Sequence, residues 1–287
     1  MIESCRSLFA VRSVGWKMVV LVVVVHVVLS TLMNFVVFPS EVLDVVEKLT
    51  FGLVNSTLQA NLLYMLIMFP LIFVVGGLKP GDVALAPATG SESTTIWKGL
   101  IWTLVALALV HIGSLIAIVC NAGPLQLSAT IENGFFNKSG LASTGLMLGQ
   151  VFGNASYEEI LFRGFLLPQL LLLFKKRNRK WSWTKCFWLA LFVSQFVFSI
   201  QHLPNLIYRS GSLDVIAICI DLVVLLVCGL VLAAVFLLTR NLYAAIGIHA
   251  IANYTPMLIT MPIVGLQFLA YFVVFVAYLW NRRRKRA

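Results

Sequence analysis

Long apolar stretches separated by short polar segments make up most of this chain. Runs such as residues 18–38 are apolar on every side and do not alternate between apolar and polar positions. About 20 apolar residues in a helix cross a hydrocarbon core that is roughly 30 Å thick, whereas the strands of a membrane barrel alternate over about ten residues. The pattern therefore predicts an all-α polytopic membrane protein with about eight transmembrane helices, in a single integral membrane domain over residues 1–287.

The eight predicted spans end at prolines, glycines or polar segments. The first run exceeds the core of a removable signal peptide, which is about 7–15 residues long, so we expect it to be retained as a membrane span. The predicted spans lie at about 18–38, 58–77, 97–120, within 143–174, and at about 184–203, 213–239, 242–262 and 264–281.

Composition supports the membrane class and narrows the partners. Of the 287 residues 60% are hydrophobic and 11% are charged, which lies outside the range of soluble proteins. The net charge of +10 comes from basic residues beside the apolar segments, as in 175–185 and 282–286. With both termini cytoplasmic, 17 of the 21 Lys and Arg fall on the cytoplasmic side, as the positive-inside rule requires. We therefore predict a multi-pass protein in a lipid bilayer with both termini cytoplasmic and no nucleic-acid partner.

Three charged residues lie within the fourth predicted span, in the sequence NASYEEILFRGFLLP of residues 154–168. A charge in a bilayer must face protein or a water-filled cavity, so Glu158, Glu159 and Arg163 indicate a functional site. Glu159 and Arg163 are four residues apart with the acid first, the favourable order for an ion pair on a helix. Glu158 points about 100° away from Glu159, which leaves it available for another role.

The same span is too long for one simple helix. Residues 143–174 would extend about 48 Å as a continuous helix, against a core of roughly 30 Å. Gly153 and Asn154 lie in the middle, and Ser156 precedes Glu159 by three residues, the spacing of a capping box. We therefore expect a break near 153–156, a new helix from Tyr157, and a cavity wall at the break.

Two of the four histidines have an aromatic or amide side chain four residues away on the same helix. His202 follows Phe198 by four residues in the fifth span, and Asn253 follows His249 by four residues in the seventh. Residues four apart share one face of a helix. Each pair alone also fits a structural role, since histidine and asparagine often form hydrogen bonds between membrane helices.

Other polar residues of the spans have no such pattern. His26 and His111 lack comparable company and are interpreted as structural, while Asp221 is expected to be a buried acid that partners Arg163 or a histidine. Counting helical rise from the predicted cytoplasmic ends places Glu158 roughly 24 Å deep and His249 about 13 Å deep. Straight parallel helices would not bring them together, so the face from which the site opens is left undecided.

Together these residues resemble the motifs EExxxR, FxxxH and HxxxN of the CAAX-protease and bacteriocin-processing family, which includes the type II CAAX prenyl endopeptidases. The segments that carry them are EEILFRGFLLPQL, FVFSIQH and LLTRNLYAAIGIHAIAN, on predicted spans four, five and seven. The resemblance covers about 145–260, and the first three spans, at about 18–120, add little beyond helix number. It implies a polar intramembrane cavity lined by helices 4, 5 and 7.

The resemblance also implies a function. The family's members are intramembrane endopeptidases, so we expect hydrolysis of a peptide bond in a membrane-associated or lipidated peptide or protein that arrives from the membrane or its surface. Carboxylates and imidazoles suit general base catalysis, and aimed donors suit oxyanion stabilisation. The implied roles are water activation by Glu158 and His202, oxyanion binding by His249 and Asn253, and support by Glu159, Arg163 and Phe198.

Three alternatives stay open from the sequence. A catalytic zinc site can use one Glu and two His as its protein ligands, and Glu158, His202 and His249 would supply that set. We nevertheless expect no metal and no other cofactor. The five cysteines show no CxxC spacing and are interpreted as small hydrophobic residues. A non-catalytic immunity or scaffold protein of the same fold is the second alternative, and an ion-coupled transporter the third. The substrate, whether a prenylated tail, a bacteriocin leader or another peptide, is not specified by any motif.

Overall fold

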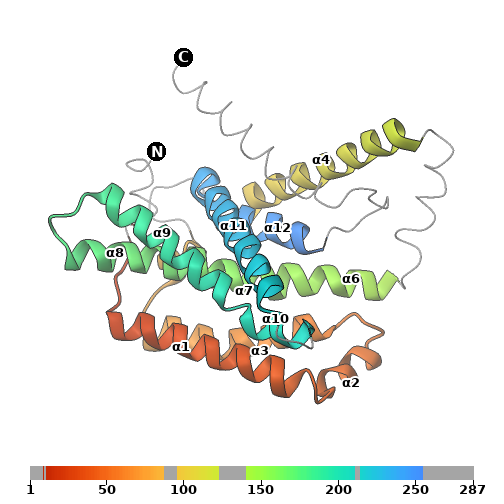
Figure 1. Ribbon diagram of the computed structural model, residues 1–287, viewed down its shortest axis with the longest axis horizontal. Helices are drawn as coiled ribbons and strands as arrows, with labels where there is room; N and C mark the ends of the chain where they lie inside the picture. Colours follow the sequence, from red (N-terminus) through yellow and green to blue (C-terminus); the bar gives the residue numbers. More distant parts are fainter. Residues whose placement is uncertain (1–8, 10, 87–95, 123–139, 211–213, 255–287) are drawn as a thin grey trace.

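The chain forms helices, and no strands, in the residues that the structure describes, which are 9, 11–86, 96–122, 140–210 and 214–254. The structure is a computed structural model, shown in Figure 1. It confirms the predicted all-α class. Along the chain the elements are α1 (Trp16–Leu32), η2 (Met33–Val37), α2 (Val42–Leu49), α3 (Ser56–Pro70), η3 (Leu71–Val75), η4 (Pro80–Val83), α4 (Ile96–Ala122), α6 (Gly140–Leu148), η6 (Gly149–Asn154), α7 (Ala155–Glu159), η7 (Ile160–Leu166), α8 (Leu167–Arg177), α9 (Trp183–Ile200), α10 (Leu203–Ser210), α11 (Val215–Thr239) and α12 (Leu242–Asn253).

Five helical segments of the described part are long and apolar enough to cross a membrane, and they overlap the predicted first, second, third, fifth and sixth spans. The polytopic membrane class is thus confirmed. The seventh predicted span begins with the shorter helix α12, and its remainder and the eighth span lie outside the described residues, so the count of eight stays a prediction. The five segments are Trp16–Val37, Ser56–Val75, Ile96–Gly113, Trp183–Ser210 and Val215–Thr239.

The fourth predicted span belongs to one continuous helical rod from Gly140 to Arg177, seen as the row of α6, α7 and α8 in Figure 1. The predicted break near 153–156 is therefore wrong. Two π-helical stretches, η6 and η7, flank α7, and the residues at each junction keep right-handed helical backbone angles. The wider π turns absorb extra residues without interrupting the helix, and such turns are frequent at functional sites.

The predicted capping box is also absent. The Ser156 hydroxyl donates to the carbonyl oxygen of Val151, 2.5 Å away, because a residue inside a rod has no free backbone N–H groups to cap. Glu159 instead turns to a side chain one turn further along, Arg163.

The other helices surround this rod. α3 packs against η6, α9 packs against α8 and α12 packs against α7, while α11 lies against α9 and α12, and α4 against α12. Glycine permits some of these approaches. A Cβ atom on Gly145 of α6 would lie 1.9 Å from the carbonyl oxygen of Gly52, so only glycine fits where this helix meets the loop before α3.

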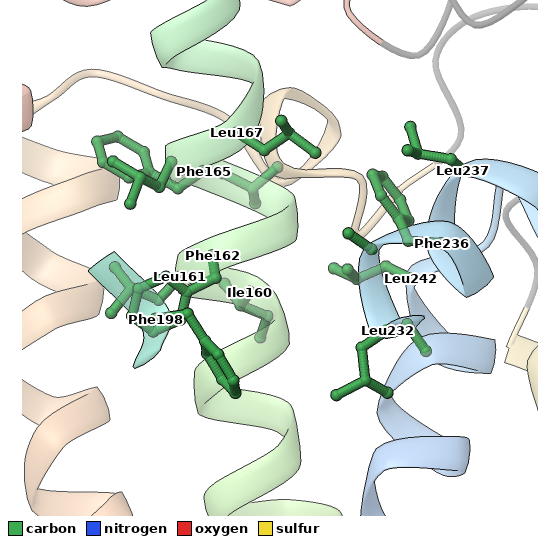
Figure 2. Packing of buried hydrophobic residues seen from close by; sticks show 14 of the residues in the cluster. Ile160, Leu161, Phe162, Phe165, Leu167, Phe198, Leu232, Phe236, Leu237 and Leu242 are labelled. Carbon is green, nitrogen blue, oxygen red and sulfur yellow. The ribbon is translucent and has the colours of Figure 1, made fainter. Parts of the chain in front are cut away.

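The half of the rod that follows Glu159 lies in the hydrophobic core. Phe162, Phe165 and Leu167 are almost fully buried, and Figure 2 shows apolar side chains of α11 and α12, including Leu232 and Phe236, on the neighbouring side. Other helices present apolar side chains outward, as lipid contact requires. Large exposed examples are Leu66, Val74 and Ile216, each more than 70% exposed.

Basic residues gather where the chain before α1, the chain after α3 and the α8–α9 loop meet. Arg12 donates from its backbone nitrogen to Asp82 and from Nη1 to the Gly77 carbonyl, and the Trp16 ring packs on Phe174. We call this region the basic end. Its Lys and Arg residues are Arg12, Lys17, Lys79, Lys175, Lys176, Arg177, Arg179, Lys180 and Lys185.

The region where η2 ends and α3 begins is called the far end. Asn205 of α10 donates to Asn34 of η2 at 2.9 Å, and the ring of Phe38 stacks on Tyr208. Helices α1 and α3 run between the two ends in opposite directions, and the α9–α10 segment reaches the far end from the α8–α9 loop.

Candidate active site

Glu158 and Glu159 lie on α7, between the two π-helical stretches of the rod, and both are buried. Adjacent helical positions send them in different directions. Glu158 faces a cavity that is also lined by His202 and His249, whereas Glu159 faces Arg163 on its own rod. The expected separation of the two carboxylates is therefore seen in the structure.

Glu158 lies between two histidines. Its Oε1 is 3.8 Å from His202 Nε2, and its Oε2 is 3.6 Å from His249 Nε2. These distances exceed those of direct hydrogen bonds and suit polar groups that share a water molecule. Oε2 makes no hydrogen bond to the described protein atoms. The structure thus brings together one predicted catalytic side chain from α7, one from the turn after α9 and one from α12.

The structure places His249 Nε2 3.6 Å from Glu158 Oε2, although helical rise counted from Arg240 set the two residues at different depths, and α12 begins inside the protein. Asn241, the residue before α12, is only 1% exposed, and its side chain accepts a hydrogen bond from the Ala244 backbone nitrogen. Almost every residue of α12 up to Ile251 is buried. Counting helical rise from Arg240 therefore does not measure depth in the membrane.

The ion pair between Glu159 and Arg163 is present and fully buried. Arg163 Nη1 lies 2.9 Å from Glu159 Oε1, and Nη2 donates to the carbonyl of Gly229 on α11 at 2.9 Å. The same Glu159 oxygen is 2.8 Å from His249 Nδ1. The pair was expected to fix a helix start. In the structure it ties the rod to α11 and fixes the orientation of His249.

Phe198 fills the space between the charged pair and the histidines. Its ring lies 4.4 Å from the guanidinium carbon of Arg163, a cation–π geometry that lets a buried cation contact an apolar side chain. The same ring meets the His202 ring edge-on at 5.2 Å and lies 6.4 Å from the His249 ring. The spacing of four residues between Phe198 and His202 thus lets one helix face contact both groups.

Asn253 ends α12 beside the same cavity. It is exposed, and its side-chain nitrogen donates to Gln150 Oε1 of η6 at 3.0 Å. Gln150 also lines the cavity. The sequence did not single out Gln150, because it has no charged or aromatic residue at helical spacing.

The site also includes three polar residues that the sequence interpretation missed, namely His26, Tyr157 and Gln201. His26 of α1, interpreted from the sequence as structural, is buried and has polar partners on other parts of the chain. Its Nδ1 lies 2.6 Å from the Tyr157 hydroxyl, and its Nε2 contacts Gln201 Oε1. The Gln201 side-chain nitrogen then donates to Glu158 Oε1 at 3.2 Å and lies 3.3 Å from His202 Nε2. These partners are far apart in sequence, so no local spacing signals them.

The cavity has a volume of about 530 Å³, within the range of roughly 300–1,000 Å³ for ligand pockets. Along the rod its lining ends at Glu158, and along α9 it starts at Phe198. It then extends past α10 and η2 toward the far end. The described residues that line it are His26, Ser30, Asn34, Phe38, Thr57, Ala60, Asn61, Tyr64, Gln150, Asn154, Tyr157, Glu158, Phe198, Gln201, His202, Asn205, Leu206, Arg209, Leu225, Cys228, Leu232, His249, Ala252 and Asn253.

Asp221 does not belong to this buried group. Its side chain is exposed on α11, so the expectation of a buried acid is wrong. α11 buries mainly the residues after Gly229, and in its first two turns only Ile218 is buried. The helix therefore reaches the core too late to cover Asp221.

No group of three or more His, Cys, Asp or Glu side chains in the described residues is arranged to hold a metal ion. Glu158, His202 and His249, the ligand set of the zinc alternative, do not form such a group. The described cysteines, Cys186, Cys219 and Cys228, are free thiols.

Comparison with known families gives one finding. Residues 140–255 match the family model described as type II CAAX prenyl endopeptidase Rce1-like, so the resemblance drawn from the three motifs is confirmed over that segment. The matched family is a protease family. No curated protein and no solved structure matches the chain.

Proposed function

We propose that this integral membrane protein, which carries a segment of the type II CAAX prenyl endopeptidase family, is an intramembrane endopeptidase that uses Glu158 as its base. One observation supports the proposal above all others. A buried carboxylate lies between two imidazoles, at 3.8 Å from one and 3.6 Å from the other, on the wall of a peptide-sized cavity. A carboxylate that serves only to balance charge would be paired with Arg163, and that role is taken by Glu159.

In the proposed reaction, Glu158 and His202 bind a water molecule and remove one of its protons as the oxygen attacks the peptide carbonyl carbon. The C–N bond of the resulting tetrahedral intermediate then breaks. The proton held by Glu158 or His202 passes to the leaving amine, and the new carboxylate leaves with the other half of the peptide. General acid–base catalysis of this kind contributes about 10²–10⁴-fold to rate.

His249 and Asn253 supply the donors for the oxyanion in this proposal. His249 Nδ1 faces the Glu159 carboxylate, which only accepts hydrogen bonds, so this nitrogen carries a hydrogen. His249 can therefore donate to an oxyanion from Nε2 only when both ring nitrogens carry hydrogens. Glu159 faces Nδ1 and Glu158 faces Nε2, so a carboxylate lies on each side of the ring.

The proposed substrate is a membrane-associated or lipidated peptide. The matched family description indicates prenylated tails as the first class to test. We would purify the protein in detergent and follow cleavage of a quenched fluorescent peptide that has a farnesylated cysteine four residues from its C-terminus. The same peptide without the lipid, together with an unrelated hydrophobic peptide, reports whether the lipid is required.

Glu158→Gln is expected to reduce cleavage by about 10²–10⁴-fold, and His202→Ala and His249→Ala by a similar factor. His111→Ala is the matched control, because His111 bonds to the carbonyl of Leu107 on its own helix and does not line the cavity. Cleavage at the wild-type rate by Glu158→Gln would falsify the assignment. Tight peptide binding without cleavage by the wild-type protein would favour the non-catalytic alternative.

A further inference from the structure

A chain of hydrogen bonds leads from α1, through Gln201, to Glu158. At its start lies His26, a buried residue of α1 whose Nε2 contacts Gln201 Oε1. At its end the Gln201 side-chain nitrogen donates to Glu158 Oε1 at 3.2 Å. Gln201 directly follows α9 and is buried as well. The chain therefore connects a residue of the first helix to the carboxylate that we propose as the base.

Packing holds the first two members of this chain in place. The His26 ring lies 5.8 Å from the Tyr64 ring and meets the Phe162 ring edge-on at 5.9 Å, measured between ring centroids. Ser30, one turn after His26 on α1, donates from its hydroxyl to the backbone carbonyl of Gln201 at 3.3 Å. The side chains of His26 and Gln201 are therefore fixed against each other from both helices.

The charge of Glu158 sets the direction of each hydrogen bond in the chain. A carboxylate only accepts hydrogen bonds, so the Gln201 amide must present its nitrogen to Glu158 and its oxygen to His26. His26 Nε2 must then carry a hydrogen. A neutral ring with its hydrogen on Nε2 accepts at Nδ1, where the Tyr157 hydroxyl lies 2.6 Å away. The expected form of His26 therefore has its only ring hydrogen on Nε2.

The same amide also faces His202. Its second hydrogen is directed to His202 Nε2, 3.3 Å from the Gln201 side-chain nitrogen, which leaves that ring nitrogen as an acceptor. In a neutral His202 the ring hydrogen is then on Nδ1. One amide thus presents a donor to each of the two groups that are proposed to take a proton. It occupies Oε1 of Glu158, while Oε2 has no hydrogen-bond partner among the described atoms and is left to receive the proton.

We propose that His26 and Gln201 are positioning residues that hold Glu158 and His202 ready to receive a proton. The proposal rests on the proposed function for the reaction that uses this proton. Without His26 the Gln201 amide loses the donor that fixes its orientation, and a flipped amide would set its oxygen against the Glu158 carboxylate. His26 lies outside residues 140–255, the segment that matches the family. The first helix thus contributes to the site a residue that none of the three motifs contains.

The positions of the ring hydrogens can be measured without any proteolysis. Protein labelled with nitrogen-15 histidine is placed in lipid bilayers at neutral pH, and solid-state magnetic resonance distinguishes ring nitrogens that carry a hydrogen from those that do not. The chain has four histidines, so each signal is assigned by its loss when that histidine is replaced. We expect a hydrogen on Nε2 alone in His26 and on Nδ1 alone in His202.

A hydrogen on Nδ1 of His26 or on Nε2 of His202 overturns the proposed arrangement. Gln201→Met removes the amide, so His202 should no longer be confined to the form with its hydrogen on Nδ1. His111→Leu is the matched control, because His111 bonds to the carbonyl of Leu107 on its own helix and does not line the cavity. It should leave the signals of His26 and His202 unchanged. An unchanged His202 signal in Gln201→Met would also count against the proposal.

The rate of cleavage measures what this positioning contributes. His26→Leu and Gln201→Met should each lower kcat for the farnesylated peptide about tenfold to a hundredfold, as for loss of a hydrogen bond to a charged group. Both residues line the cavity and can also contact the peptide. The comparison therefore uses kcat at saturating peptide and does not depend on KM. His111→Leu should keep the wild-type kcat.

Rescue separates positioning from a merely structural role. The amide nitrogen of a glutamine reaches about the place of Nε2 in a histidine, whereas that of an asparagine reaches about the place of Nδ1. His26→Gln therefore keeps a donor toward Gln201 and should recover most of the kcat lost in His26→Leu. His26→Asn, which is equally polar but directed toward Tyr157, should not. Equal impairment of His26→Gln and His26→Leu would contradict the positioning role.

Coupling gives the second kinetic criterion. The His26→Leu/Gln201→Met double variant should be no slower than the slower single variant, because both residues act through one chain. Multiplicative losses in the double variant would show independent effects and overturn the proposal. Tyr157→Phe, which removes only a hydroxyl, is the milder variant if the others do not fold, and it should lower kcat in the same direction.

The measurements distinguish failure of this proposal from failure of the proposed function. Glu158→Gln is measured alongside the positioning variants. If it cleaves normally the proposed base is wrong, and if the wild-type protein cleaves nothing the proposed function fails, while the ring-hydrogen measurement still decides the arrangement of the chain. If Glu158→Gln is inactive and both positioning variants have the full kcat, only the positioning role is wrong.

Discussion

Replacement of Arg163 by methionine tests whether the buried ion pair holds the site together. Methionine keeps much of the apolar stem of arginine but removes its charge. Glu159 is then left fully buried with one hydrogen bond, to His249 Nδ1. The substitution also removes the hydrogen bond from Arg163 to the Gly229 carbonyl on α11 and the contact of Arg163 with the Phe198 ring.

The magnitude follows from the uncompensated charge. Removing one partner of a buried pair costs about 3–5 kcal/mol, whereas replacing both partners by neutral groups of similar size is often close to neutral. Arg163→Met should therefore lower the free energy of unfolding by about 3–5 kcal/mol. The Glu159→Gln/Arg163→Met double variant should recover most of that loss, because no buried charge is left.

Unfolding in detergent, followed by tryptophan fluorescence, measures both values. Arg209→Met serves as the control, because Arg209 is exposed, and it should change stability by no more than about 0.5 kcal/mol. The reasoning is refuted if Arg163→Met is as stable as the control, or if the double variant is less stable than Arg163→Met alone.

Three further outcomes are expected. Gly145→Ala should destabilise the protein by about 1–3 kcal/mol, because its Cβ would lie 1.9 Å from a backbone oxygen. Gly140→Ala, on the same helix with open space around it, should have little effect. Equal thermal unfolding of the two variants would contradict this expectation. Asn253→Ala should reduce cleavage by about 10²–10³-fold. Gln150→Leu should reduce it by less, since Gln150 accepts the hydrogen bond that orients the Asn253 amide; a larger loss in Gln150→Leu would reverse that order. Treatment with a strong zinc chelator should leave cleavage unchanged, and loss of activity that added zinc restores would establish the metal alternative.

The sequence predicts those parts of the site that follow from local spacing. Glu159 and Arg163 are four residues apart on one helix, so their ion pair is readable directly from the sequence. The FxxxH and HxxxN spacings likewise place Phe198 beside His202 and set Asn253 one turn after His249. The membrane class follows from long apolar runs, which need no knowledge of tertiary contacts.

Contacts between distant helices are not readable in this way. His26 lies in an apolar span where only Ser30, four residues later, is polar at helical spacing. Its hydrogen-bond partners Tyr157 and Gln201 are 131 and 175 residues away. The same reason explains the failed capping box. Ser156 and Glu159 have the correct spacing, but a serine inside a continuous helix finds a carbonyl of the preceding turn, that of Val151.

The rod itself joins these observations. A helix broken at mid-membrane would expose backbone groups at the very depth where the site lies, and these would need partners. A continuous rod with two π-helical stretches keeps its hydrogen bonds and still turns Glu158 toward the cavity and Glu159 toward the core. Arg163, one turn later, marks the level at which the rod passes from cavity wall to packed core. Glu159 of the buried ion pair therefore orients His249, and the buried residues that follow it on the rod close the cavity toward the basic end.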